Sequence, residues 1–225
     1  MTTVLLPLAQ ALLPTGVHFD EVWVEAGKGG ELSPLFPEEL PIVECAVEKR
    51  QREFRAGRHV ARRALNLAGG PSGALLRGVH GQPGFPPGYQ GSITHTGRVH
   101  TYAAAVATRA PWLLGIDAEL SSELSADLAQ RIASPAELEE AGRHAAHPGL
   151  LVFAAKEAAY KCVYPLCGRV LGFEEVRLLR AGASRLELEV LALQGTPVVE
   201  VRWLRGQEVT LCLAVFPLTQ APESR

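Results

Sequence analysis

The chain has 225 residues, of which 47% are hydrophobic, and its formal net charge is −2 at pH 7. This length allows one large domain or two of about a hundred residues each. The slightly acidic total charge argues against a protein that coats nucleic acid. No apolar run reaches the ~20 residues that span a bilayer, and the start lacks the basic segment of a secretory signal. We therefore expect a cytoplasmic protein with neither a nucleic-acid nor a membrane partner.

The first 25 residues favour extended structure. Residues 4–13 are apolar, but Pro7 interrupts them and Pro14 ends them, which indicates a strand or a buried segment. Apolar residues then alternate over residues 17–24, a pattern typical of a strand.

A long helix dominates the rest of the first half. Apolar spacing predicts it over residues 38–67, with Pro41 in its first turn. A loop rich in glycine and proline follows over residues 78–91. Residues 92–94 and 99–108 then favour a hairpin.

The second half repeats the mixture of strands and helices. Residues 112–117 predict a short apolar strand, and residues 125–163 a helical region broken near Pro135 and Pro148. The tail, residues 174–216, alternates apolar and polar residues as strands do.

Together these patterns predict an α+β protein with two similar halves. Each half has a long helix and a hairpin that ends in an apolar strand. We place the halves at residues 1–111 and 112–225, although their identity is too weak to prove a repeat.

Two carboxylates end the predicted strand in Gly115-Ile-Asp-Ala-Glu119. Residues two apart on a strand share a face, so Asp117 and Glu119 point the same way. Two neighbouring carboxylates repel unless a cation lies between them, and oxygen ligands suit Mg²⁺. The alternative is an ordinary solvated strand end.

The segment Phe153-Ala-Ala-Lys-Glu-Ala-Ala-Tyr-Lys161 holds two of the four lysines of a chain that has eighteen arginines. On a helix, Glu157 and Lys161 form a favourable pair of about 0.3–0.5 kcal/mol. The surroundings are rich in alanine and look buried, where Lys156, Glu157 and Lys161 need compensating charge. A metal on Glu157 and phosphates on the two lysines would supply it.

The predicted helix also carries a basic segment, Glu48 to Arg63, with seven Lys or Arg residues against two Glu. Its side chains form either a solvated face or a phosphate-binding face. Gly57 in mid-helix indicates close approach by another group. Ser92 and His95 lack the surrounding G-x-S-x-G elbow of a hydrolase. We expect the His95 imidazole either to be buried in the core with its hydrogen bonds satisfied or to form a hydrogen bond with a phosphate.

These elements resemble the Sfp-type 4′-phosphopantetheinyl transferases. The segments 115–119 and 153–161 look like the two defining motifs of that family. Three more segments are similar to the branch that includes the enterobactin synthetase component D: Glu48 to Phe54 with Gly57-Arg58 and Ala61-Arg62, Gly81-Gln-Pro-Gly-Phe-Pro86, and Gly91-Ser-Ile-Thr-His95. The fold so implied is a pseudo-dimer of two α/β halves.

The resemblance implies transfer of 4′-phosphopantetheine from coenzyme A to a serine of an acyl- or peptidyl-carrier protein, releasing 3′,5′-ADP. It implies a Mg²⁺ site of Asp117, Glu119 and Glu157 in the C-terminal half, with Glu157 also the base. Lys156 and Lys161 would contact the pyrophosphate and take part in catalysis. The nucleotide would be held mainly by the N-terminal half, through Arg50, Arg58, Arg77, His80, Thr94 and His95.

Two alternatives stay open at this point. One is a metal-dependent phosphoesterase that acts on a nucleotide-like diphosphate. The other is a catalytically silent module that binds coenzyme A or a carrier. We expect a monomer that serves siderophore or polyketide biosynthesis, and the resemblance leaves the carrier itself open.

Overall fold

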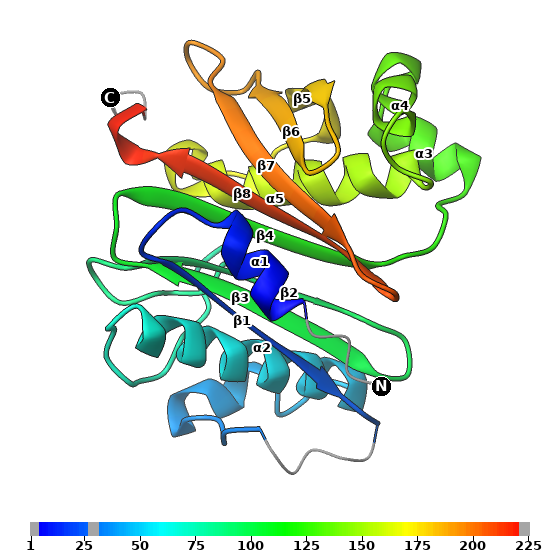
Figure 1. The fold of residues 1–225 in the computed structure, drawn as a ribbon. Coiled ribbons are helices and arrows are strands. Elements are labelled where there is room, and N and C mark those ends of the chain that lie inside the picture. Colours follow the sequence, from blue (N-terminus) through cyan, green and yellow to red (C-terminus); the bar gives the residue numbers. More distant parts are fainter. Residues whose placement is uncertain (1–4, 27–31, 221–225) are drawn as a thin grey trace. The chain divides into compact units, whose positions relative to one another are not determined.

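The computed structural model describes residues 5–26 and 32–220. The chain divides between Ala110 and Pro111 into two compact units. Each unit is an antiparallel sheet with one helix of 20 residues packed on it (Figure 1). The predicted α+β class with two halves is confirmed.

The N-terminal unit holds a three-stranded sheet in the order β1-β3-β2. Its elements are α1 (Leu6–Leu12), β1 (Val17–Val24), η1 (Pro37–Ile42), α2 (Glu48–Leu67), β2 (Gln90–Thr96) and β3 (Thr101–Thr108). Alanines make up much of the contact between α2 and β3, including Ala56, Ala61, Ala103 and Ala105. Small side chains on both elements let the helix lie close to the sheet.

Residues 6–12 form a helix, so the predicted strand or buried segment over residues 4–13 is wrong for this described part. Pro7 lies in the first turn of α1, where a missing N–H costs no helical hydrogen bond. Glu21 of β1 accepts a hydrogen bond from the Leu6 N–H at 2.7 Å and so caps the helix from outside. The local sequence around residues 6–12 gives no indication of this long-range cap.

The helix predicted over residues 38–67 is two helices. η1 and α2 are separated by residues 43–47, and Val47, 74% exposed, is the N-cap residue of α2. The carboxylate of Glu39 is fully buried and accepts hydrogen bonds from the N–H groups of Phe36 and Leu75 and from Arg62. These partners tie η1 to other parts of the unit, whereas a straight helix would carry Glu39 away from them.

A buried carboxylate on β1 should make the stability of this unit depend on pH. Asp20 is 1% exposed, and burial raises its pKa to about 6 although Arg63 Nε lies 2.9 Å from Oδ2. A raised pKa means that stability falls as pH rises from about 4 through 6. Asp20→Asn should therefore raise the free energy of unfolding above pH 7 by up to about 3 kcal/mol.

The difference between Asp20→Asn and the parent should vanish near pH 3, where Asp20 is protonated in both states. Urea unfolding at several pH values measures this, with Glu44→Gln, at an exposed position, as the control. An unchanged or lower stability of Asp20→Asn at pH 8 would contradict the prediction.

The C-terminal unit holds a five-stranded sheet in the order β4-β8-β7-β6-β5. Its strands are β4 (Trp112–Leu120), β5 (Val176–Ala181), β6 (Arg185–Val190), β7 (Val198–Arg205) and β8 (Val209–Pro217). Its helices are α3 (Ala126–Ile132), α4 (Pro135–Gly142), α5 (Pro148–Cys167), η2 (Phe173–Glu175) and η3 (Leu218–Gln220). The predicted strands and the helix breaks near Pro135 and Pro148 agree with these bounds.

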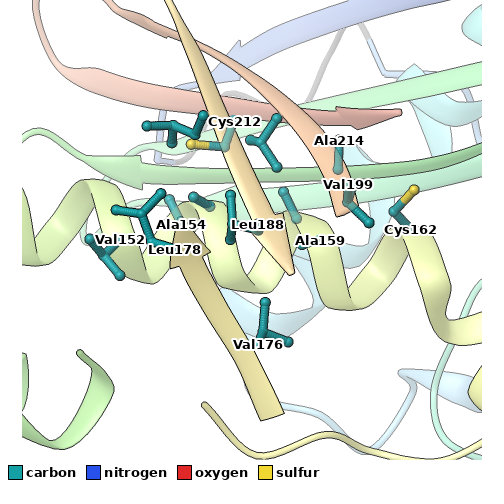
Figure 2. Close-up of a cluster of buried hydrophobic side chains, with 14 of the residues drawn as sticks. Val152, Ala154, Ala159, Cys162, Val176, Leu178, Leu188, Val199, Cys212 and Ala214 are labelled. Carbon is teal, nitrogen blue, oxygen red and sulfur yellow. The ribbon is translucent and has the colours of Figure 1, made fainter. Parts of the chain in front are cut away.

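Helix α5 lies across one face of this sheet and forms the core with it (Figure 1). Figure 2 shows Ala154 and Ala159 of α5 facing strand residues such as Leu188 and Cys212. The helix also carries three charged side chains, the adjacent Lys156 and Glu157 and, one turn later, Lys161. Over the described parts of the chain, no helix has both the length and the hydrophobicity needed to cross a bilayer.

Candidate active site

The strand–helix contact that organises the site is the approach of α5 to β4 at Gly115. A Cβ atom on Gly115 would lie 1.9 Å from the Ala158 carbonyl oxygen and 2.6 Å from the Cys162 nitrogen. Only a glycine fits there, because both neighbouring atoms belong to the helix backbone. The Cys162 thiol also donates to the Leu113 carbonyl at 3.3 Å. The glycine of the 115–119 motif therefore sets the distance between the two motifs.

Asp117, Glu157 and Lys161 come together two residues beyond that contact. Asp117 is 5% exposed, and its Oδ1 accepts a 2.6 Å hydrogen bond from Lys161 Nζ. Lys161 also donates to the Ile116 carbonyl at 3.2 Å. Burial raises the pKa of Glu157; the positive charge of Lys161 opposes this rise and the negative charge of Asp117 adds to it. The site is thus a carboxylate pair with one lysine between β4 and α5.

Glu119 lies two residues further along β4, on the same face as Asp117, and is partly exposed. Within the described residues, no three His, Cys, Asp or Glu side chains are gathered closely enough to hold a metal ion. The Lys161 ammonium is instead the cation beside Asp117. The carboxylate oxygens of Asp117, Glu119 and Glu157 are donors of the kind that a hard divalent ion such as Mg²⁺ prefers.

The structure does not place Lys156 with Lys161. Its ammonium is 2.9 Å from the Ile132 carbonyl, 3.1 Å from the Phe173 carbonyl and 2.9 Å from Glu137 Oε1. Its three N–H donors are used and the residue is 3% exposed. This geometry favours a role inside the protein over the expected contact with a pyrophosphate.

Three of the residues predicted to bind the nucleotide, Arg50, Arg58 and Arg77, form a basic cluster in the N-terminal unit. Arg58 is 6% exposed, donates from Nε to the Leu75 carbonyl at 2.6 Å and lies over the Phe54 ring. Burial lowers its pKa to about 10; Glu39 opposes this, and the charges of Arg62, Arg50 and Arg77 add to it. Guanidinium groups held near one another in this way favour an anion.

His95 of β2 extends this cluster, because its Nε2 lies 2.9 Å from Arg50 Nη1. Gly57 lets α2 approach β2, since a Cβ atom there would lie 3.0 Å from the Ile93 side chain. The predicted close approach at Gly57 is confirmed. Thr94, on the same strand, is buried.

The loop between α2 and β2 carries the remaining predicted residues, Arg77 and His80, both exposed. A bridge between Arg77 and Pro83 closes the loop, and the His80 N–H donates to Gln82 Oε1 at 3.0 Å. Phe85 packs against Gly91, where it would meet any added Cβ atom. The loop therefore has an ordered backbone that presents Arg77 and His80 to solvent.

Sequence reasoning missed two buried glutamates that hold the charged residues of the motifs. Glu39 pairs with Arg62 at 2.8 Å and lies 3.7 Å from Arg58, and Glu137 pairs with Lys156. For Glu137 a local signal existed, because Ser134 and Glu137 have the spacing of a capping box. Nothing local indicates that its other partner is 19 positions away.

Comparison with known proteins agrees with this geometry. A family profile described as "4'-phosphopantetheinyl transferase N-terminal domain" matches residues 36–108, and one described as "4'-phosphopantetheinyl transferase superfamily" matches residues 113–214. The chain belongs to the 4′-phosphopantetheinyl transferase superfamily. Such enzymes transfer phosphopantetheine from coenzyme A to carrier proteins and are generally metal-dependent.

Three curated relatives carry the same name. The 4′-phosphopantetheinyl transferase PptT of Mycobacterium tuberculosis is 36% identical over 94% of this chain and 98% of its own length. Svp of Streptomyces mobaraensis is 36% identical over 95% of this chain and 92% of its own. Npt of Nocardia iowensis is 37% identical over 76% of each. This chain is therefore a 4′-phosphopantetheinyl transferase over both of its units.

Proposed function

We propose that this transferase uses Mg²⁺ and modifies a serine of an acyl- or peptidyl-carrier protein in siderophore or polyketide biosynthesis. The observation that carries the proposal is the cluster of Asp117, Glu157 and Lys161 between β4 and α5. We further propose that the enzyme belongs to the enterobactin synthetase component D-like branch. It would act as a cytoplasmic monomer, without nucleic-acid or membrane partners.

In the proposed reaction, the serine oxygen attacks the phosphorus atom that bears the pantetheine arm. The bond from that phosphorus to the bridging pyrophosphate oxygen breaks, and 3′,5′-ADP leaves. Glu157 is suited to accept the serine proton, because its raised pKa brings it closer to neutral pH. Lys161 neutralises charge on the pyrophosphate oxygens.

The Mg²⁺ would be held by Asp117, Glu119 and Glu157. When bound, it would stabilise the negative charge that develops on the pyrophosphate oxygens. Among the protein's own groups, Lys161 supplies positive charge to this site, since its ammonium lies 2.6 Å from the Asp117 carboxylate.

The nucleotide phosphates would be bound by the basic cluster of the N-terminal unit. The residues proposed are Arg50, Arg58, Arg77, His80, Thr94 and His95. Support comes from the charges of Arg50 and Arg77, which help to lower the pKa of Arg58, and from the contact between Arg50 and His95. Arg58 has a second role, because its Nε also holds the Leu75 carbonyl.

Mass spectrometry of carrier proteins tests the proposal. Purified enzyme with coenzyme A and Mg²⁺ should add one phosphopantetheine mass to the serine of at least one carrier in a panel of apo acyl- and peptidyl-carriers. Chelation with EDTA should stop the reaction, and added Mg²⁺ should restore it. Folded enzyme that binds coenzyme A but modifies no carrier would contradict the transfer, and full activity in EDTA would contradict only the metal.

Removing the exposed arginines should weaken coenzyme A binding. Arg50→Ala and Arg77→Ala should each raise the KM for coenzyme A about tenfold or more, since a charge-assisted phosphate contact contributes about 1.5–3 kcal/mol. Arg55→Ala is the matched control, because Arg55 is exposed on α2 and lines a separate groove with Leu35 and Leu40. A rise confined to the KM for the carrier would instead mark a carrier-docking surface.

A further inference from the structure

We infer that Lys156 and Glu137 form a positioning pair: their buried contact sets the rotation of α5 and thereby the placement of Glu157 and Lys161. The inference rests on the proposed role of Glu157 as the base. It assigns Lys156 a role different from the expected contact with pyrophosphate, and it brings Glu137, on another helix, into the function of the site.

Lys156 joins three separate parts of the C-terminal unit to α5. Its ammonium donates to the carbonyl of Ile132 at the end of α3 and to that of Phe173 in η2, and it pairs with Glu137 of α4. An ammonium group has three N–H donors, so these partners saturate it. A phosphate could reach it only if one of these contacts broke.

Hydrogen bonds from backbone N–H groups also fix the Glu137 carboxylate. Its Oε1 accepts a 2.8 Å hydrogen bond from the Leu178 N–H of β5, and its Oε2 accepts from the Ser134 N–H at 2.8 Å. Burial alone would raise the pKa of Glu137, but the Leu178 N–H and Lys156 outweigh burial and lower it. The carboxylate is therefore charged in the folded protein, as an ion pair requires.

Leu178, the partner of Glu137, lies on β5, which is an edge strand of the sheet. Glu140, one turn later on α4, accepts a 3.0 Å hydrogen bond from the Ala181 N–H of the same strand. α4 thus covers backbone donors that an edge strand would otherwise expose. Lys156 connects this assembly of α4 and β5 to α5.

Because of helix geometry, the contacts of Lys156 also affect where Glu157 and Lys161 lie. Successive residues are about 100° apart around a helix, so Lys156 and Glu157 point to different sides, while Glu157 and Lys161 share one side. Gly115 of β4 contacts the helix on another side, at Ala158. With α5 held at Lys156 and at Ala158, its rotation is determined, and Glu157 and Lys161 are directed to Asp117.

Two single variants and their double variant test the pair. Lys156→Met leaves a buried carboxylate without its cation, and Glu137→Gln leaves a buried cation without its carboxylate. Each should lower Tm by about 5–10 °C and kcat by about 10- to 100-fold, with the Kd and KM for coenzyme A within twofold of the parent. The double variant should lose less Tm than the sum of the two, because it buries neither charge alone.

The pH profile of kcat adds a readout that simple loss of stability would not change. If Glu157 moves relative to Asp117 and Lys161, the apparent pKa of the base should shift in both single variants. Glu139→Gln is the matched control, since Glu139 lies on α4 in an exposed ion pair with Arg143 and should leave Tm, kcat and pH profile unchanged.

Two outcomes would overturn the inference. A Kd for coenzyme A raised tenfold in Lys156→Met but not in Glu137→Gln would make Lys156 a phosphate ligand. Reduced Tm with unchanged kcat and pH profile in both variants would make the pair structural only. If Lys156→Met does not fold, Glu137→Gln, whose single amide oxygen can still accept one of the two backbone hydrogen bonds, decides between these outcomes through its kcat and pH profile.

Discussion

Glu157→Gln is expected to lower kcat by about 10²- to 10⁴-fold, the usual contribution of a general base, while raising Tm at pH 7 in the absence of coenzyme A and metal. Glutamine keeps the shape of the side chain but cannot accept the serine proton. Burial raises the pKa of Glu157 despite the nearby Lys161. The charged carboxylate is therefore less stable in the folded than in the unfolded protein.

The pH dependence of this stabilisation has a definite sign. A carboxyl group with a raised pKa loses stability as pH rises from its unfolded pKa through its folded pKa. The gain in Tm for Glu157→Gln should thus be largest above that window and should shrink below about pH 4.

Calorimetry across pH and single-turnover transfer to a carrier measure the two effects of Glu157→Gln. Glu174→Gln is the control, because Glu174 is exposed in the same unit. A kcat within threefold of the parent would remove Glu157 from the role of base. A lower Tm at pH 7 would show that the carboxylate is stabilised by its surroundings instead of strained by burial.

Gly115→Ala is expected to destabilise the C-terminal unit by about 4 kcal/mol or more, or to prevent folding. The added methyl group would lie 1.9 Å from the Ala158 oxygen and 2.6 Å from the Cys162 nitrogen. Neither backbone atom can move unless α5 moves away from β4. Any folded protein should then have Asp117 separated from Lys161 and should transfer phosphopantetheine slowly.

Chemical unfolding of Gly115→Ala, together with its yield of soluble protein, measures this effect. Gly73→Ala is the matched control, because nothing lies within 4 Å of a Cβ atom there. A loss below about 1 kcal/mol in Gly115→Ala would mean that α5 can shift at little cost, and the close approach would then not explain the glycine.

Local sequence patterns predicted most of the secondary structure of this enzyme. They failed where a hydrogen-bond partner distant in the sequence determines where a helix begins or ends. Alternation of apolar and polar residues indicated strands within residues 174–216, and the proline positions located the starts of α4 and α5. The same rules misjudged residues 6–12, where Glu21 of β1 accepts a hydrogen bond from the Leu6 N–H. They also misjudged residues 38–47, where Glu39 accepts hydrogen bonds from Phe36 and Leu75, which lie outside the predicted helix.

The order of the motifs and the family resemblance they carry can be read from the sequence alone. So can the shared face of Asp117 and Glu119 and the shared side of Glu157 and Lys161, because residue spacing within one strand or one helix dictates which side chains share a face. The different roles of the two lysines follow from how α5 packs in the folded unit. Lys161 donates to Asp117, whereas Lys156 pairs with Glu137. Helical periodicity predicts that these lysines point to different sides of α5. Which side of α5 faces β4 depends on the contact at Gly115 and on packing against α3, α4 and η2.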